Sequence, residues 1–295
     1  MIMGYWDLNG DGSIDRVYAG DLHGNLWKFD VSASNDGSWD IAFTTSGGGS
    51  PTPAPLFTAV DAGGTAQPIT VRPAVGLHPK GGIMLYFGTG KFFEVGDNVV
   101  PLNPPVNSFY GIRDEGDEVS GRGVLQPQTI QNELYGVSFG SNVFDVRVVS
   151  DNTIDYSTQK GWYLDLQSPV NGAEGERVVV DPLLRNGRMI FSTLIPSLDT
   201  CGFGGTGWLM EVDAVNGARF SFSVFDLDGD GLGLALGNAV DLQPTVALVN
   251  DPALAVDGDA PGVGLALARI GQQRAAASEG RVEHEVGVHA GQTDP

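Results

Sequence analysis

Short runs of alternating apolar and polar residues recur along the chain and are separated by turns rich in Gly and Pro. In residues 15–30 this alternation lies on both sides of a turn at His23 and Gly24. Because a β-strand points successive side chains to opposite faces, the pattern predicts a hairpin of two strands. Further strands are predicted at residues 82–88, 91–94, 178–182 and 188–195. Short strands joined by tight turns indicate an all-β protein.

Three related phrases repeat along the chain, at residues 24–30, 161–165 and 207–213. Each phrase has a Gly, then large apolar residues, then an acid. Their starts lie 137 and 46 residues apart, and a four-stranded propeller blade occupies about 40–50 residues. The spacing therefore fits three blades and one blade, and it predicts a β-propeller. Each phrase also carries a tryptophan that we expect in the core of a blade: Trp27, Trp162 and Trp208.

The composition changes near residue 250, and no earlier boundary is evident. Residues 1–250 are predicted to form a portion of a propeller. Residues 251–295 are rich in Ala, Gly, Arg and Glu with little strand periodicity, which predicts a weakly ordered tail. The chain begins directly before a loop of functional type, without the basic and then apolar pattern of a signal peptide. We expect it to be part of a longer protein.

An acidic loop follows the first few residues of the chain. It matches positions 1, 3, 5, 6 and 9 of a twelve-residue calcium loop with Asp7, Asn9, Asp11, Gly12 and Asp15. Ser13 would add its backbone carbonyl, and Ca²⁺ prefers such oxygen ligands. Position 12 is Tyr18 in place of the usual Glu, so waters or a distant group would have to complete the shell. The alternative is a turn of Asp, Asn and Gly that needs no metal.

A second acidic stretch begins with Asp226, Asp228 and Asp230. Its positions 9 and 12 are Leu234 and Gly237, which offer no side-chain oxygen. Three carboxylates without a fourth form a poor calcium cage, so the sequence favours a charged turn here over a metal site.

The formal net charge is -20 and the isoelectric point is about 4.3. Such a surface repels a phosphate backbone, which argues against nucleic acid as a partner. It attracts cations, although the same charge would also serve solubility. No apolar run approaches the ~20 residues of a membrane-spanning helix. The single cysteine, Cys201, excludes an internal disulfide and could be a buried residue, a free thiol or the partner of a cysteine elsewhere.

Two glycine-containing motifs resemble catalytic signals. Residues 136–140 fit the Gly-x-Ser-x-Gly pattern around Ser138, but a predicted strand follows where a nucleophile elbow requires a helix. Residues 202–207 are glycine-rich, but they lead into a predicted strand and lack the Lys of a phosphate-binding loop. The sequence therefore predicts a binding module and no enzyme, with no catalytic residues.

Four phrases together resemble one family. They are residues 7–30 (DLNGDGSIDRVYAGDLHGNLWKFD), 86–91 (YFGTGK), 107–112 (NSFYGI) and 203–213 (FGGTGWLMEVD). In order and combination they resemble the C-terminal β-propeller of PilY-type type IV pilus tip adhesin and biogenesis proteins, over residues 5–245. The resemblance implies a modified β-propeller of the quinoprotein-like type. Family members are longer, with a signal peptide and a variable N-terminal region, so an incomplete or C-terminal portion of the propeller is expected here.

The resemblance also implies a function. It places Ca²⁺ ligands on Asp7, Asn9, Asp11 and Asp15, with Ser13 contributing its carbonyl. It implies support of pilus assembly, surface attachment and twitching motility. The implied partners are pilus tip or minor pilin components and a host or abiotic surface. The implied location is extracytoplasmic, at the pilus tip, cell surface or outer membrane of a Gram-negative bacterium.

Two other propeller families share parts of this pattern. Quinoprotein dehydrogenases have similar repeat phrases and use calcium beside a quinone, but many carry a vicinal cysteine pair that this chain lacks. Integrin-like calcium propellers share the acidic loop, but they repeat it in several blades. Only one good copy is visible here.

Overall fold

The computed structural model of the chain describes residues 3–45, 50–139, 142–198, 205–222, 225 and 247–248. The chain divides into two units, Met1–Asp257 and Gly258–Pro295, and every described residue belongs to the first. The second acidic stretch, Cys201 and the tail of residues 251–295 lie outside the described residues. What the sequence predicts for them stays a prediction.

The described residues form strands and loops without an α-helix. Two short 3₁₀ turns occur, η1 (Asp36–Ser38) and η2 (Arg122–Val124). The strands are β1 (Met3–Trp6), β2 (Arg16–Gly20), β3 (Asn25–Asp30), β4 (Asp40–Ile41), β5 (Phe43–Thr45), β6 (Thr52–Ala54), β7 (Phe57–Thr58), β8 (Ala74–Leu77), β9 (Ile83–Gly88), β10 (Ser108–Asp114), β11 (Gln126–Gln128), β12 (Ile130–Phe139), β13 (Asn142–Val149), β14 (Gly161–Asp165), β15 (Leu183–Arg185), β16 (Arg188–Ser192), β17 (Ile195–Pro196), β18 (Gly205–Thr206), β19 (Leu209–Asp213) and β20 (Ala247–Leu248). The predicted all-β class is confirmed.

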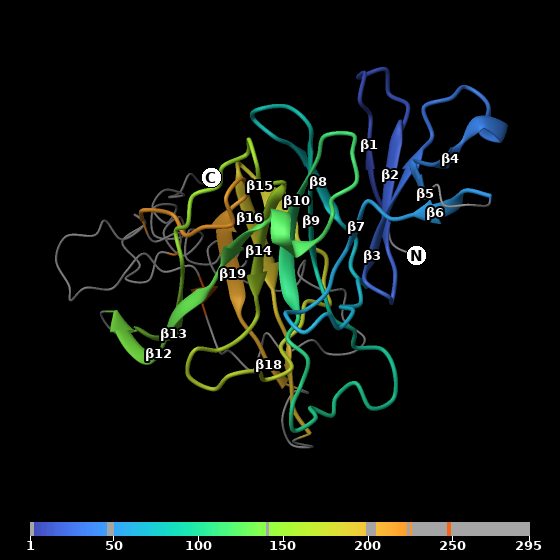
Figure 1. Ribbon diagram of the computed structural model, residues 1–295. Helices are drawn as coiled ribbons and strands as arrows, with labels where there is room; N and C mark the ends of the chain where they lie inside the picture. The colour runs from blue at the N-terminus through green and yellow to red at the C-terminus, as the bar shows by residue number, and fades with distance from the viewer. Residues whose placement is uncertain are drawn as a thin grey trace, which may run out of the picture. The chain divides into compact units, whose positions relative to one another are not determined.

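These strands assemble into three large sheets (Figure 1). The first sheet has the order β1-β2-β3-β4, with β7 also beside β3. The second has the order β11-β14-β10-β9-β8, and the third β12-β13-β20-β19-β16-β15. Two small sheets, β5-β6 and β17-β18, complete the described topology. Among the described pairs, only β11 and β14 run parallel.

One edge strand of each large sheet lies beside an edge strand of the next. β1 contacts β8, and β8 contacts β15. The approach is close at two glycines. A Cβ on Gly4 of β1 would lie 2.5 Å from the Pro73 carbonyl oxygen, and one on Gly76 of β8 would lie 2.4 Å from Leu184 of β15. Adjacent edge strands from successive sheets are the arrangement of neighbouring blades in a propeller.

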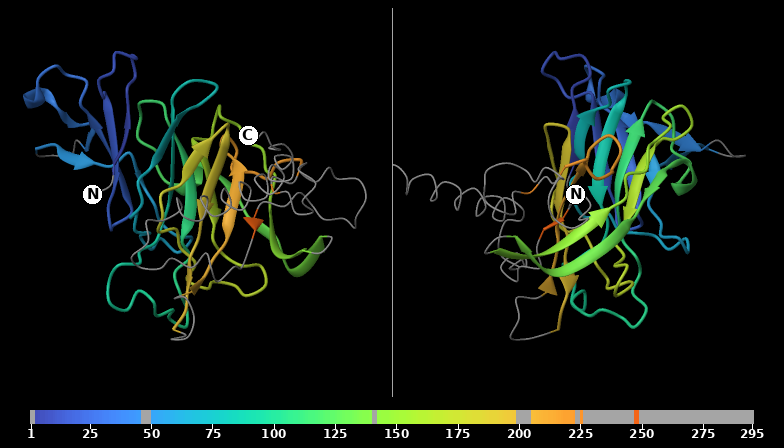
Figure 2. Two further views of the ribbon diagram at one scale, coloured as in Figure 1. Left: turned by 180° about the vertical axis from the view of Figure 1, so that it is seen from behind. Right: turned by 90° about the vertical axis from the view of Figure 1, so that its left-hand side faces the viewer.

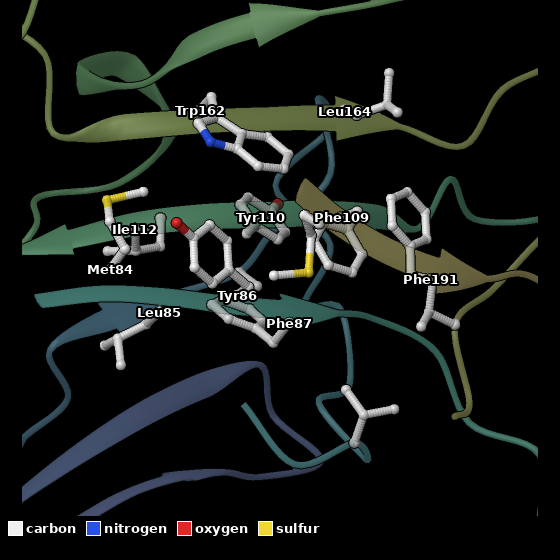
Figure 3. Packing of buried hydrophobic residues seen from close by; sticks show 14 of the residues in the cluster. Met84, Leu85, Tyr86, Phe87, Phe109, Tyr110, Ile112, Trp162, Leu164 and Phe191 are labelled. Carbon is white, nitrogen blue, oxygen red and sulfur yellow. The ribbon is translucent and has the colours of Figure 1, made fainter. Parts of the chain in front are cut away.

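The second and third sheets meet in an aromatic core (Figure 3). Phe109 of β10 stacks on Phe191 of β16, with ring centroids 3.9 Å apart. Trp162 of β14 is fully buried, and its indole N–H donates to the Ala214 carbonyl at 3.1 Å. Trp208 is also buried, so two of the three repeat tryptophans lie in the core as predicted. Trp27 is only half-buried.

The first sheet has two unlike faces. On the face toward the second sheet, Tyr18 and Leu26 are fully buried. On the other face, Met3 and Tyr5 are 46% and 59% exposed, and Phe29 is half-buried. Within the described residues this second face is therefore only partly covered, because Ala19 is fully buried on it but its β1 edge is exposed. Such a face is expected in a portion of a propeller, because complete blades are covered on both sides.

The predicted strands are confirmed at some positions and wrong at others. The hairpin within residues 15–30 is β2 paired with β3, from Arg16 opposite Asp30 to Gly20 opposite Leu26. The buried strand within residues 82–88 is β9. The strand predicted at residues 91–94 is wrong, because this segment turns around an Asp side chain (see below). Residues 178–182 form no strand either; the bridge between Arg177 and Leu194 precedes them, and β15 begins directly after them at Leu183.

Candidate functional site

The acidic loop, residues 7–15, joins β1 to β2 at one end of the first sheet (Figure 1). Trp6 pairs with Arg16 in the ladder, and the Asp15 N–H donates to the Trp6 carbonyl at 2.9 Å. Both flanks of the loop are therefore strands, as the sequence predicted, and the helices of a helix-loop-helix calcium site are absent from this described region.

Asp7 organises the first half of the acidic loop. Its Oδ1 accepts the N–H of Gly10 at 2.7 Å, and its Oδ2 accepts the N–H of Gly12 at 2.8 Å. Both glycines have positive φ, 76° and 88°, a backbone conformation that residues with a Cβ rarely adopt. The sequence of Asp and Gly at this spacing thus curls the backbone around one carboxylate.

The other predicted ligands make the same kind of bond. Asn9 Oδ1 accepts the Asp11 N–H at 2.9 Å, and Asp11 Oδ1 accepts the Ser13 N–H at 2.7 Å. These Ser13 contacts lower the pKa of the Asp11 carboxyl. Asp15 Oδ2 accepts the Leu8 N–H at 2.7 Å, and Asp15 is buried whereas the rest of the loop is mostly exposed.

The donor chemistry of this loop fits calcium. Its side-chain donors are all oxygens, and a carboxylate that accepts one N–H keeps further lone pairs for a cation. No three His, Cys, Asp or Glu side chains in the described part of the chain are grouped so that they could hold a metal ion. Calcium binding by Asp7, Asn9, Asp11, Ser13 and Asp15 therefore stays a prediction.

The acidic loop is hydrogen-bonded to the end of β3, at the open end of the β2–β3 hairpin. The Asp15 carbonyl accepts the Val31 N–H at 2.9 Å and the Arg16 guanidinium at 2.8 Å. The same guanidinium lies 2.6 Å from Asp30 Oδ1. Asp15 and Arg16 therefore connect the end of the acidic loop to the end of β3.

Asp21 is a turn residue that the sequence analysis did not single out. Its carboxylate accepts the N–H groups of His23 and Asn25 and the indole N–H of Trp27, the last at 2.9 Å. Burial opposes ionisation, but these hydrogen bonds outweigh it and lower the pKa of Asp21. Alternation along β3 places Trp27 on the face opposite to the buried Leu26 and Lys28, and Asp21 satisfies the indole N–H there.

A buried ionic cluster was also missed. Arg147 of β13 lies 2.6 Å from both Glu133 Oε1 and Glu176 Oε1, and all three side chains are at most 1% exposed. The guanidinium lies 4.1 Å from the ring centroid of Trp208. Glu133 lies opposite Arg147 in the β12–β13 hairpin, whereas Glu176 and Trp208 come from outside it, so no single local motif indicated the whole cluster. Its hydrogen bonds fasten the base of the β12–β13 hairpin to the loop before β15.

The sequence of this chain is similar to those of known proteins over much of its length. Residues 4–138 match the family model of the PilY1 beta-propeller domain. The chain is 35% identical over 265 residues to a Type IV pilus biogenesis factor PilY1 homolog of Xylella fastidiosa, covering 89% of this chain and 16% of the relative. It is 36% identical over 254 residues to the Type IV pilus biogenesis factor PilY1 of Pseudomonas aeruginosa, covering 77% and 21%.

A solved structure agrees with these matches. The crystal structure of the Pseudomonas aeruginosa PilY1 C-terminal domain superposes with a TM-score of 0.70 and 28% sequence identity, covering 83% of this chain and 53% of that one. The chain belongs to the PilY1-type β-propeller family.

The PilY1-type assignment confirms the predicted family and propeller class. It favours this family over the quinoprotein dehydrogenases and the integrin-like propellers. The chain spans 16% and 21% of the length of the two curated relatives named above, so it corresponds to a minor part of each.

The catalytic motifs find no support in the described part of this PilY1-type domain. Ser138 lies within β12, and β13 follows it in a hairpin, so the helix that a nucleophile elbow requires is replaced by a strand. Gly205 and Thr206 form β18, while residues 202–204 lie outside the described residues. Within the described ranges, no helix is both long and apolar enough to traverse a bilayer.

Proposed function

We propose that this PilY1-type domain is a calcium-responsive part of a type IV pilus biogenesis factor that acts outside the cytoplasm. The observation that carries the proposal is the acidic loop between β1 and β2, which combines calcium-type donors with a rigid sheet. The names of the relatives support the link to pilus biogenesis. Support of pilus assembly, surface attachment and twitching motility, with pilus tip components and a host or abiotic surface as partners, forms part of the proposal.

Asp7, Asn9, Asp11 and Asp15 would hold the ion through side-chain oxygens, with the Ser13 carbonyl beside them. Bound there, Ca²⁺ would offset the mutual repulsion of the carboxylates. The ion would draw these oxygens together in the folded loop, and the unfolded chain offers no such site, so the ion would stabilise the folded state.

Asp15 passes this effect into the sheet. Its backbone is hydrogen-bonded to Val31 and Arg16, and Arg16 pairs with Asp30. We therefore expect an ordered loop to fix the start of β2 against the end of β3. The surface formed by this hairpin would then differ between the calcium-bound and calcium-free protein.

Thermal and urea unfolding of the full chain, with and without calcium, test the proposal. At a calcium concentration about 100 times Kd, the free energy of unfolding should rise by about 2.7 kcal/mol. Asp11→Ala should abolish this gain. Asp36→Ala removes an equally exposed acid in η1 and should leave the gain unchanged. No stabilisation by calcium, or an equal gain in Asp11→Ala, would contradict calcium binding at this loop.

The pilus role is tested separately in the intact protein of the organism. Asp11→Ala there should reduce twitching motility and surface attachment, whereas Asp36→Ala should not. Normal motility and attachment in Asp11→Ala would separate the calcium loop from pilus function even if calcium binds.

A further inference from the structure

A long loop with exposed apolar side chains connects β9 to β10. It spans residues 89–107, which is well beyond the few residues of an ordinary hairpin connection. Phe93 is 63% exposed, Leu102 is 96% exposed and Val95 is fully exposed. We call residues 89–107 the apolar loop. Surface apolar residues scattered singly need no explanation, but three highly exposed ones within one loop make that loop a candidate interaction site.

The exposure in the first half of the apolar loop is imposed by a built turn. Asp97 Oδ2 accepts the N–H groups of Phe93 and Glu94 at 3.0 and 2.9 Å. Lys91 pairs with Glu94 and with Asp97. From outside the loop, Arg177 donates to the carbonyls of Lys91 and Asp97 at 2.9 and 3.0 Å. Phe93 and Val95 are thus presented by a fixed backbone.

The second half of the apolar loop is also packed at its base. A Cβ on Gly175 would lie 3.2 Å from Val100 Cγ1, which shows how closely Val100 sits on the neighbouring loop. Its neighbour Val99 is 50% exposed, and Leu102 lies almost wholly in solvent. The loop therefore has an inner residue that anchors it and outer residues that protrude.

Few charges lie beside the protruding side chains. Glu94 and Asp97 are the charged residues of residues 92–106, and Lys91 pairs with both, so residues 91–106 keep a net charge of -1. The whole chain has a net charge of -20 and would be repelled by an anionic surface. The apolar loop therefore fits an apolar environment without negative charge.

We propose that the apolar loop inserts Phe93, Val95 and Leu102 into the interfacial region of an uncharged, zwitterionic lipid bilayer. A rigid protein partner would need a surface that matches three protruding side chains from different positions in the loop. A bilayer interface adapts to them and buries their apolar area. The loop projects from the end of the sheets opposite to the acidic loop, in both Figure 1 and Figure 2. We therefore expect lipid binding not to depend on calcium.

Flotation of the full chain with phosphatidylcholine vesicles tests the proposal. The protein should float with the vesicles equally in calcium and in EDTA. Val95→Ser and Leu102→Ser should each lower the partition coefficient about tenfold, and the double variant about a hundredfold. Leu77→Ser is the matched control, because Leu77 is 68% exposed at the end of β8 and lies outside the apolar loop. Adding anionic phosphatidylglycerol should weaken binding.

Because the side chains of Val95 and Leu102 are exposed, the variants should keep the circular dichroism spectrum of the parent protein. Absence of flotation at millimolar lipid, or equal flotation of the parent and the double variant, would overturn the proposal. So would stronger binding to anionic than to neutral vesicles. If the double variant lost surface attachment while the parent protein bound no vesicles, the loop would be a protein-docking site instead. Failure of calcium binding at the acidic loop would leave these results unchanged.

Discussion

The Lys28 ammonium in β3 lies 2.7 Å from Asp114 Oδ2 at the end of β10, so an ion pair connects the first sheet to the second. The Tyr18 hydroxyl donates to the same Asp114 oxygen at 2.8 Å. Burial and the neighbouring Asp114 carboxylate raise the pKa of Tyr18, so it remains a donor. The two sheets are therefore joined by a buried polar contact as well as by apolar packing.

Removing Asp114 should be strongly destabilising. Asp114→Ala leaves the buried Lys28 ammonium without its partner, and breaking a buried pair in this way costs about 3–5 kcal/mol. Urea unfolding of the full chain measures the change. The control is Asp181→Ala, because Asp181 pairs with Arg72 at 3.4 Å on the surface, where such a pair contributes about 0–1 kcal/mol. An equal effect of both substitutions would show that the sheet contact does not depend on the ion pair.

Arg147 should be needed for its charge and for its shape. Arg147→Met would leave Glu133 and Glu176 buried without a counter-charge, and we expect a loss of about 3–5 kcal/mol in the free energy of unfolding. Arg147→Lys keeps the charge, but an ammonium cannot replace the guanidinium hydrogen bonds to both carboxylates. It should therefore be intermediate in thermal unfolding. A neutral effect of Arg147→Met would mean that the hairpin is held by apolar packing alone.

His78 should make stability depend on pH. Its Nδ1 accepts the Lys80 N–H at 3.1 Å, its ring lies 4.2 Å from that of Tyr156, and Nε2 has no hydrogen-bond partner among the described residues. Burial, then the charges of Arg113 and Lys80, lower its pKa, and Glu115 opposes this shift. Near pH ~6.5, His78 therefore binds a proton more readily in the unfolded chain than in the folded protein.

Because the pKa of His78 is lowered in the folded protein, the free energy of unfolding should fall as the pH falls below the ordinary pKa of histidine. His78 makes no pH-dependent contribution well above pH ~6.5, and its neutral form costs stability as pH falls below that value, until the folded pKa is reached. His78→Phe should therefore flatten the fall in urea midpoint between about pH 7 and pH 5. The carboxylates of the protein titrate equally in both proteins, so the difference isolates His78. Parallel pH profiles would contradict the assignment.

Local sequence was sufficient where the deciding contacts are local. The alternation around residues 15–30 and the apolar run at residues 82–88 predicted β2, β3 and β9 correctly. The acidic loop is shaped by side chains that bind backbone groups two to seven residues away. Its curl and its strand flanks could therefore be predicted from residue types and spacing.

The segment at residues 91–94 shows where local pattern fails. Its apolar residues predicted a strand, but Asp97 draws the backbone into a turn and Arg177 holds that turn from another loop. The alternation of apolar and polar residues cannot predict a turn that is held by a side chain 80 residues further along the chain. The apolar residues are consequently exposed in a loop instead of paired in a sheet.

The sequence by itself determined the strand class, the repeated blade phrases and the calcium-type donor set, because each depends on alternation or on spacing within one turn. Only the tertiary structure decided that Lys28 meets Asp114 and that Arg147 meets Glu133 and Glu176. These partners lie 86, 14 and 29 residues apart. Buried charges need partners wherever the packed sheets bring them, and a one-dimensional pattern does not record which sheet faces meet.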